Sequence, residues 1–138
     1  MRMVFTDAEL AYLDSQPIGR LATQQPDGTL QVNPVGFAWN PETGTIDIGG
    51  FRMSRSRKYR NVADNGRAAL VVDDLRSTDP WRVRCLDIRG TAEFVPGTGP
   101  ANGTDPAIIR LRPTRVIGLA IEDPDVPPHE IRANARNV

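Results

Sequence analysis

Two short turn sequences constrain the fold of this chain more than any other feature. Gln-Pro-Asp-Gly occupies residues 25–28, and Asn-Pro-Glu-Thr-Gly occupies residues 40–44. Proline presets φ for a turn and glycine tolerates positive φ, so both sequences favour a tight reversal of the chain. They separate three segments typical of β-strands, at 18–23, 30–38 and 45–49. Strands joined by turns this short pair antiparallel, because a parallel pair needs a long crossover.

A helix is expected before these strands. Thr6 and Glu9 have the spacing of a capping box, and Phe5 and Leu10 can form a hydrophobic staple. The helix should end near Gln16, because the proline that follows disfavours helical backbone in the residue before it.

The second half of the chain contributes three more strands, with one helix inserted before them. We expect that helix to run from a Ser54 cap to about Asn65, with Gly66 just past its end. The strands are expected at 67–73, at 84–95 with a bend at Gly90, and at 114–121, with a polar loop at 74–80, a loop rich in glycine and proline at 96–106 and an extended tail from 123.

Six strands with short connections favour a small antiparallel β-barrel, so the fold class expected is mainly β with two helices. Pro34 interrupts the second strand, which must therefore lie at an edge or contain a bulge. A chain of 138 residues is expected to form one domain, spanning 1–138.

Composition excludes several classes of protein. The apolar runs are too short for a transmembrane helix, and the first residues lack the apolar stretch of a signal peptide. A single cysteine rules out an internal disulfide and a cysteine-rich metal site. The formal net charge of zero argues against a dedicated nucleic-acid binder. We therefore expect a cytoplasmic protein without a metal, a membrane or a nucleic acid as partner.

Groups for acid–base catalysis are few. His129, the single histidine, lies in the proline-rich tail, and Cys85 lies in an expected strand, so neither belongs to an evident catalytic triad. The acidic pairs at 73–74 and at 123 and 125 lack the spacing of a metal site. No catalytic residue is predicted, and an enzyme of this kind is most credible if a cofactor carries the chemistry.

The inserted helix begins in the most basic segment of the chain. Of 17 cations 16 are arginine, and the single lysine, Lys58, lies in a run that has five cations and no acid: Arg52, Arg55, Arg57, Lys58 and Arg60. Cations in the first turn of a helix are mildly unfavourable, because the helix dipole is positive there. A local rule broken in this way is typical of a functional site.

Two interpretations of this basic segment, residues 52–60, stay open at this point. Free backbone N–H groups, a serine hydroxyl and several cations at a helix N-terminus indicate an anion site, most plausibly for phosphate. Alternatively, the segment is a solvated helix start in which Arg60 and Asp64 form an ordinary surface pair.

Four stretches, in order along nearly the whole chain, resemble one family. They are 18–23 with 27–28 and 31–37, 54–62 with 67–74, Trp81 with 88–93, and 112–117. Together they resemble the flavin-binding split-barrel family, the pyridoxamine 5'-phosphate oxidase-like proteins, and most closely its actinobacterial branch that uses the deazaflavin coenzyme F420. The resemblance implies a six-stranded antiparallel split β-barrel that forms homodimers, with cofactor sites at the interface.

The resemblance also implies which residues bind the cofactor. Lys58, three residues before Asn61, matches the lysine that contacts the cofactor phosphate. The resemblance leaves open whether Arg55 or Arg57 assists it. The second-strand segment that lies along the ring in the family corresponds to Asn33, Pro34 and Val35. The segment near the ribityl chain corresponds to Gly50 and Ser54. Trp81 corresponds to a wall of the ring pocket or to the rim of a subunit interface.

The function implied is an oxidoreductase that passes a hydride between C5 of the deazaflavin and an electron-poor small organic substrate. Two alternatives stay open: an FMN-dependent enzyme and a non-catalytic binder of either cofactor. A nucleic-acid module that uses the basic segment ranks below both, because the net charge is zero and Tyr59 is the segment's one interleaved aromatic residue. Coenzyme F420 is favoured over FMN because its phosphodiester and glutamate tail need a long cationic track, which Arg82 and Arg84 would extend beyond the basic segment.

Overall fold

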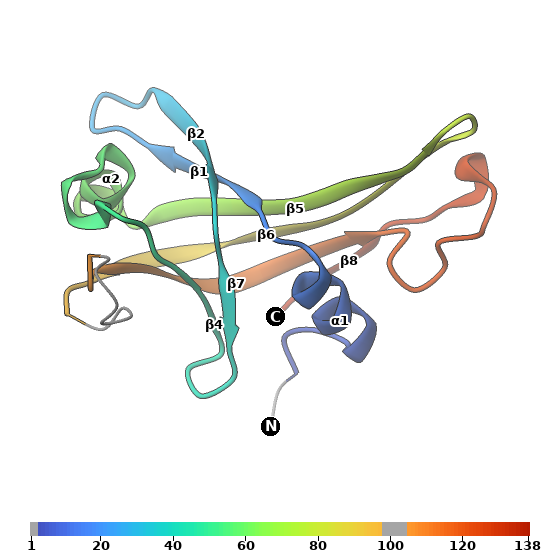
Figure 1. Cartoon of the computed structure of the whole chain (residues 1–138), viewed down its shortest axis with the longest axis horizontal. Coiled ribbons are helices and arrows are strands. Elements are labelled where there is room, and N and C mark those ends of the chain that lie inside the picture. The colour runs from blue at the N-terminus through green and yellow to red at the C-terminus, as the bar shows by residue number, and fades with distance from the viewer. Residues whose placement is uncertain (1–2, 98–104) are drawn as a thin grey trace.

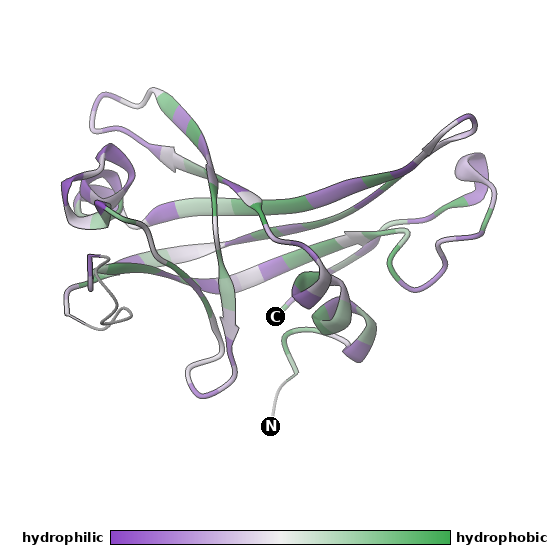
Figure 2. Cartoon of the chain, viewed as in Figure 1, coloured by the Kyte–Doolittle hydropathy of each residue, from purple (hydrophilic) through white to green (hydrophobic). Residues whose placement is uncertain are grey.

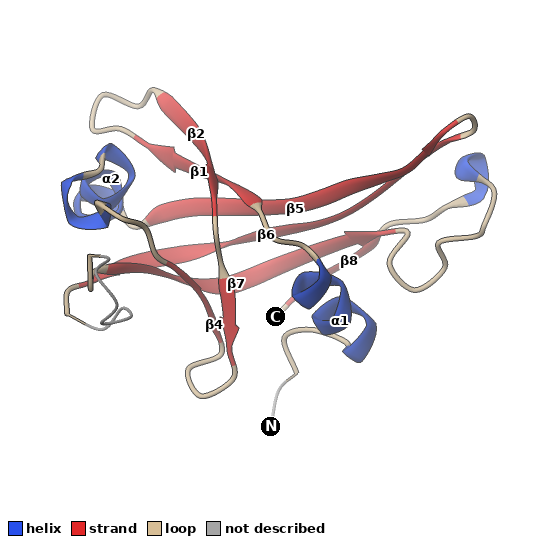
Figure 3. Cartoon of the chain, in the orientation of Figure 1, coloured by secondary structure: helices blue, strands red, loops and turns tan. Residues whose placement is uncertain are grey.

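The structure, a computed structural model, describes residues 3–97 and 105–138. Most of the loop expected at 96–106 therefore lies outside the described residues. The elements, drawn in Figures 1 and 3, are α1 (Asp7–Ser15), β1 (Gly19–Gln24), β2 (Leu30–Val35), β3 (Ala38–Asn40), β4 (Thr45–Ile48), the 3₁₀ turn η1 (Met53–Arg55), α2 (Arg57–Asn65), β5 (Arg67–Thr78), β6 (Trp81–Val95), β7 (Ile108–Leu119), the 3₁₀ turn η2 (Pro128–Glu130) and β8 (Asn134–Asn137). Neither described α-helix has the length and apolar character needed to cross a bilayer.

The strands form one antiparallel sheet in the order β2-β1-β5-β6-β7-β4-β3, with β8 added to β7. The two ends of this order, β2 and β3, are consecutive in the chain, with only Gly36 and Phe37 between them. One extended segment thus connects both ends of the sheet and crosses over its long strands (Figure 1). This arrangement, mainly antiparallel β with two α-helices, confirms the fold class expected from the sequence.

The strand count is eight rather than six, for two reasons. The strand expected at 30–38 is divided at Gly36, because its first half pairs with β1 and its second half with β4. The tail forms β8, which pairs with β7 from Arg115↔Asn137 to Gly118↔Asn134. Pro34 lies on β2, which is the end strand of the sheet order, as its missing N–H requires.

Three strands are longer than expected from the sequence. β5 continues through the segment expected as a loop at 74–80, and β6 begins at Trp81. β7 begins at Ile108, six residues early, because Pro113 is accommodated at a register shift opposite Gly90. A Cβ on Gly90 would lie 1.9 Å from the backbone oxygen of Arg112, so only glycine allows this close approach.

The core is formed by alternate residues of the strands, which Figure 2 shows as apolar positions between polar ones. Both helices cover it with a few large side chains, whereas α2 is otherwise hydrophilic. The most buried core residues include Leu21, Ile46, Ile48, Leu70, Val72, Leu86, Ile88, Ile109, Leu111 and Val116, with Leu13 from α1 and Val62 from α2.

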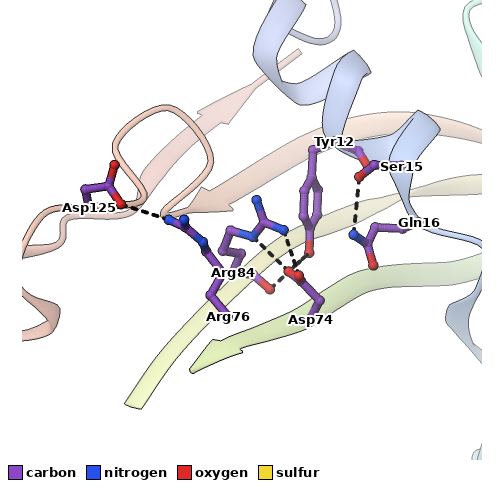
Figure 4. Close-up of polar contacts among 7 residues, drawn as sticks. All are labelled: Tyr12, Ser15, Gln16, Asp74, Arg76, Arg84 and Asp125. Carbon is purple, nitrogen blue, oxygen red and sulfur yellow. Dashed lines mark hydrogen bonds and ion pairs between the residues drawn. The ribbon is translucent and has the colours of Figure 1, made fainter. Parts of the chain in front are cut away.

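Helix α1 is fixed to the sheet by a polar network at Tyr12 (Figure 4). Its capping box forms as expected, since the Thr6 N–H donates to Glu9 Oε1 at 2.9 Å. The Tyr12 hydroxyl donates to Asp74 Oδ1 at 2.8 Å, and Arg84 donates to both oxygens of Asp74 at 2.9 and 2.7 Å. Burial, followed by the bond to Asp74, raises the pKa of Tyr12, and the Arg84 hydrogen bonds hold the pKa of Asp74 below its usual value.

Candidate cofactor site

Helix α2 begins two residues later than the sequence indicates. Ser56, not Ser54, is the N-cap: its hydroxyl accepts the Tyr59 N–H at 3.3 Å and donates to the Met53 carbonyl at 2.7 Å. Ser54 lies instead in η1, the single 3₁₀ turn before the helix. The end of the helix is as expected, with Gly66 at φ 68 accepting the left-handed conformation.

The basic segment surrounds the start of this helix. Tyr59 and Val62 turn into the core, and the Tyr59 ring meets Phe94 edge-on at 5.7 Å between centroids. The four arginines of the segment, two on α2 and two before it, are exposed, and Lys58 is half-buried. Within the described residues none of these five cations forms an ion pair, and the alternative pair of Arg60 with Asp64 is not formed. No described carboxylate is therefore in direct contact with these cations.

A chain of side-chain amides connects α2 to β2. Asn61, 1% exposed, donates to Thr23 Oγ1 at 3.0 Å and to Gln31 Oε1 at 3.2 Å. Gln31 in turn donates to Asn33 Oδ1 at 2.7 Å. Asn61 and Asn33, both predicted to bind the cofactor, are thus brought into one network, in which Asn61 positions β2 against the helix.

One atom of this network has no partner. Asn61 Oδ1 is buried and accepts no hydrogen bond from any described residue. Leaving a buried acceptor unpaired costs about 1–3 kcal/mol, so such atoms are uncommon in folded proteins and need a reason. A bound ligand that donates to Asn61 Oδ1 would remove this cost.

The other predicted residues near α2 are distributed over the adjacent loop and strand. Ser54, Arg55, Arg57 and Lys58 are contiguous around the helix start. Gly50 is exposed in the loop that leads from β4 to η1, where a Cβ would make only ordinary contact, 3.8 Å from Met53 Cε. On β2, Pro34 is exposed and Val35 is buried.

Trp81 does not join this group within one protomer. It lies at the tip of the β5–β6 hairpin, whose other end adjoins α2 (Figure 1). The 12 residues of β5 separate the two places by roughly 35 Å at about 3.3 Å per residue. Trp81 is 62% exposed there.

The expected extension of the cationic track by Arg82 and Arg84 is wrong for a single protomer. Both arginines lie at the far end of the hairpin with Trp81, and both are engaged by the chain itself. Arg82 donates to the carbonyls of Pro124 and Val126 at 3.2 and 3.0 Å, and Arg84 binds Asp74. The sequence could not show these partners, because they depend on the length of the β5–β6 hairpin and the path of the tail.

Sequence reasoning missed one residue beside the basic segment. Asp105 Oδ2 accepts both the N–H of Ser54, at 3.0 Å, and its hydroxyl, while Oδ1 accepts the Ala107 N–H at 3.0 Å. These hydrogen bonds, first that of the Ser54 hydroxyl, hold the pKa of Asp105 below its usual value, and the charge of Arg55 contributes. No local signal predicts this contact, since the two residues are 51 positions apart.

Comparison with known proteins assigns the chain to a family. Residues 5–122 match the family model described as pyridoxamine 5'-phosphate oxidase. The chain belongs to the pyridoxamine 5'-phosphate oxidase family. This confirms the resemblance carried by the four stretches of sequence.

Known proteins similar to this chain include two reductases. The chain is 45% identical over 122 residues, 87% of its length and 86% of the relative's, to the 5a,11a-dehydrotetracycline/5a,11a-dehydrooxytetracycline reductase of Streptomyces rimosus. A solved F420 reductase is 32% identical, with a TM-score of 0.61, over 80% of this chain and 96% of that one. The FAD-binding protein from Mycobacterium smegmatis, 16% identical over 99% of this chain and all of that one, shares the fold with a TM-score of 0.59. The reductase relatives confirm the prediction that this member of the pyridoxamine 5'-phosphate oxidase family is an oxidoreductase.

Proposed function

We propose that the protein is a reductase that binds coenzyme F420 at the start of α2 and delivers a hydride from it to a small, conjugated, electron-poor organic substrate. The observation that carries this proposal is the basic segment, whose five cations form no ion pair with any described residue. The dehydrotetracycline reductase and the F420 reductase among its relatives support the choice of chemistry.

The residues present fit a phosphate-bearing cofactor. Lys58, with Arg55 or Arg57, supplies charge for the phosphate, and the unpaired Asn61 Oδ1 offers an acceptor to a donor group of the ligand. Asn33, held by Gln31, and the exposed Pro34 present the edge of β2 to the ring. When bound, the cofactor supplies the hydride, and the chain binds, orients and shields it without an acid–base pair of its own.

We further propose a homodimer with the cofactor sites at its interface. The face of the sheet opposite the core is apolar where β2, β1 and β5 adjoin, since Ala22 lies beside both Val32 and Ala69 in the ladder. Val32 is 65% exposed and Leu30 79% exposed on this face. A second copy would cover them and carry its own hairpin tip, so that the partner subunit's Trp81 could reach a ligand that this protomer's Trp81 cannot.

FMN stays the second candidate cofactor, and one observation favours it. Because Arg82 and Arg84 are engaged elsewhere, the cationic track within one protomer is shorter than the sequence indicates. A single phosphate needs only Lys58 and one arginine. The basic segment still has five cations, more than FMN requires, and this surplus is the reason for preferring the deazaflavin.

Anaerobic titration followed by turnover tests the proposal. Coenzyme F420 and FMN are titrated separately into the cofactor-free protein while ligand fluorescence is followed at low salt. Tighter binding of F420, and oxidation of its reduced form only when an enone acceptor is added, are expected. Failure of F420 to bind, or FMN binding equally well, would refute the choice of cofactor.

A further inference from the structure

We infer that Asp105 is a specificity-determining residue that favours a phosphodiester over a phosphate monoester at the Ser54 end of the basic segment. The inference rests on the proposed function, which places the cofactor phosphate at Lys58 with Arg55 or Arg57, next to Ser54 in the chain. It adds a reason, from one carboxylate, why this site would accept a deazaflavin in preference to FMN.

Asp105 contacts the group that a phosphate at this end of the segment would use. Its Oδ2 takes both hydrogen-bond donors of Ser54, the N–H and the hydroxyl, and its Oδ1 is fixed by the N–H of Ala107. The carboxylate also lies within electrostatic range of Arg55 and Tyr59. The charge of Arg55 contributes to the lowered pKa of Asp105. Burial raises the pKa of Tyr59, and the charge of Asp105 raises it further. A negative charge therefore stands beside the first turn of α2, within a segment of cations.

The charge of Asp105 discriminates between ligands by the charge of their phosphate. A phosphate monoester carries about −1.5 to −2 at pH 7, because its second pKa is about 6. A phosphodiester has no second ionisation and carries −1. Repulsion by a fixed carboxylate grows in proportion to the ligand's charge, so the free-energy penalty for the monoester of FMN is roughly 1.5 to 2 times that for the phosphodiester of a deazaflavin.

The alternative, that Asp105 only anchors its own loop, predicts no dependence on ligand charge. A structural anchor affects every ligand of the pocket alike, including one without a phosphate. Riboflavin has the ring and ribityl chain of FMN and no phosphate, so it separates the two roles.

Dissociation constants of coenzyme F420, FMN and riboflavin, measured by fluorescence titration at low ionic strength, test the inference in the wild type and in Asp105→Asn. Removing a unit charge at contact distance in water changes affinity by roughly fivefold per unit of ligand charge. We expect Asp105→Asn to tighten F420 by roughly fivefold, to tighten FMN by roughly 10- to 25-fold, and to leave riboflavin unchanged.

Two further variants serve as controls. Asp105→Glu retains the charge and should retain the wild-type ratio of FMN to F420 affinity. Asp64→Asn removes an equal charge near the other end of α2, roughly 10 Å along the helix from its start, and should alter the ratio little. Thermal unfolding of each variant verifies that it is folded.

The inference is overturned if Asp105→Asn shifts all three ligands by one factor, if it leaves the FMN to F420 ratio unchanged, or if Asp105→Glu moves that ratio as far. Failure of the proposed function would give a different result. In that case the wild type itself would not bind F420, or would bind F420 no more tightly than FMN. A wild type that prefers F420, with a ratio insensitive to Asp105, would retain the proposed cofactor and reject the role of Asp105.

Discussion

Asn61 on α2 donates its buried side-chain amide to Gln31 on β2 at 3.2 Å, and this contact joins the helix of the basic segment to the strand that we propose lies along the cofactor ring. Asn61→Ala should lower the free energy of unfolding by about 1–3 kcal/mol, because Thr23 Oγ1 and Gln31 Oε1 lose a buried donor. Urea denaturation measures this change. Asn134→Ala, on exposed strand β8, should change stability by less than about 0.5 kcal/mol, and an equal loss in both variants would contradict the role of Asn61.

Lys58→Ala should weaken cofactor binding without unfolding the protein. Lys58 is half-buried in the first turn of α2 and contributes no ion pair to the described fold, so its loss costs little stability. A charge-assisted contact to a phosphate is worth about 1.5–3 kcal/mol, which corresponds to a roughly ten- to hundredfold rise in Kd. Fluorescence titration of F420 measures it, with the exposed Arg132→Ala as the matched loss of one cation. Unchanged affinity in Lys58→Ala would exclude the residue from the site.

Stability should depend on pH through the Tyr12–Asp74–Arg84 network. The pKa of Asp74 is lowered in the folded state, so its contribution is present above the unfolded value of about 3.9 and is lost as the pH falls below it. The pKa of Tyr12 is raised, so its contribution is present below about 10 and is lost as the pH rises further.

Unfolding free energies measured from pH 3 to pH 11 check both directions. The stability difference between wild type and Asp74→Asn should shrink below about pH 4, and that between wild type and Tyr12→Phe should shrink above about pH 10. Differences that stay constant with pH would show that neither group is coupled to folding.

Local signals in the sequence predicted local structure well, and contacts between distant segments account for what was missed. The capping box at Thr6 and the glycine after α2 were correct because both depend on neighbours within four residues. The N-cap of α2 was misplaced because Ser54 and Ser56 are both good caps, and because Ser54 instead donates hydrogen bonds to Asp105, 51 residues away.

The longer hairpin was missed for a similar reason. Residues 74–78 have the polar composition of a loop, and they form a strand because β6 pairs with them, with Arg84 opposite Asp74. The proximity of the predicted residues around the start of α2 followed from the sequence, because the basic segment is contiguous. The isolation of Trp81 at the hairpin tip could be found only from the fold.

Gly90→Ala should destabilise the protein strongly. Its Cβ would lie 1.9 Å from the Arg112 oxygen and 2.8 Å from the carbonyl carbon, and these are backbone atoms that cannot rotate away. Relief requires β6 and β7 to separate at the register shift, so we expect a loss of at least about 3 kcal/mol, the upper range for overpacking. Gly49→Ala is the matched control, because nothing lies within 4 Å of the Cβ built there. Similar melting temperatures for the two variants would contradict the close approach of the strands.

Val32→Asp tests whether the open face of the sheet is the surface that a second copy covers. Val32 is 65% exposed beside Ala22, and a carboxylate there would be buried without a partner if the face were covered in a dimer. We expect wild type to scatter light as a dimer at micromolar concentration and Val32→Asp to scatter as a folded monomer with weaker affinity for F420. Ala133→Asp, which adds the same charge at an exposed position before β8, should leave both properties unchanged. A wild-type monomer that binds F420 would refute shared sites, and a Val32→Asp dimer would place the interface on another surface.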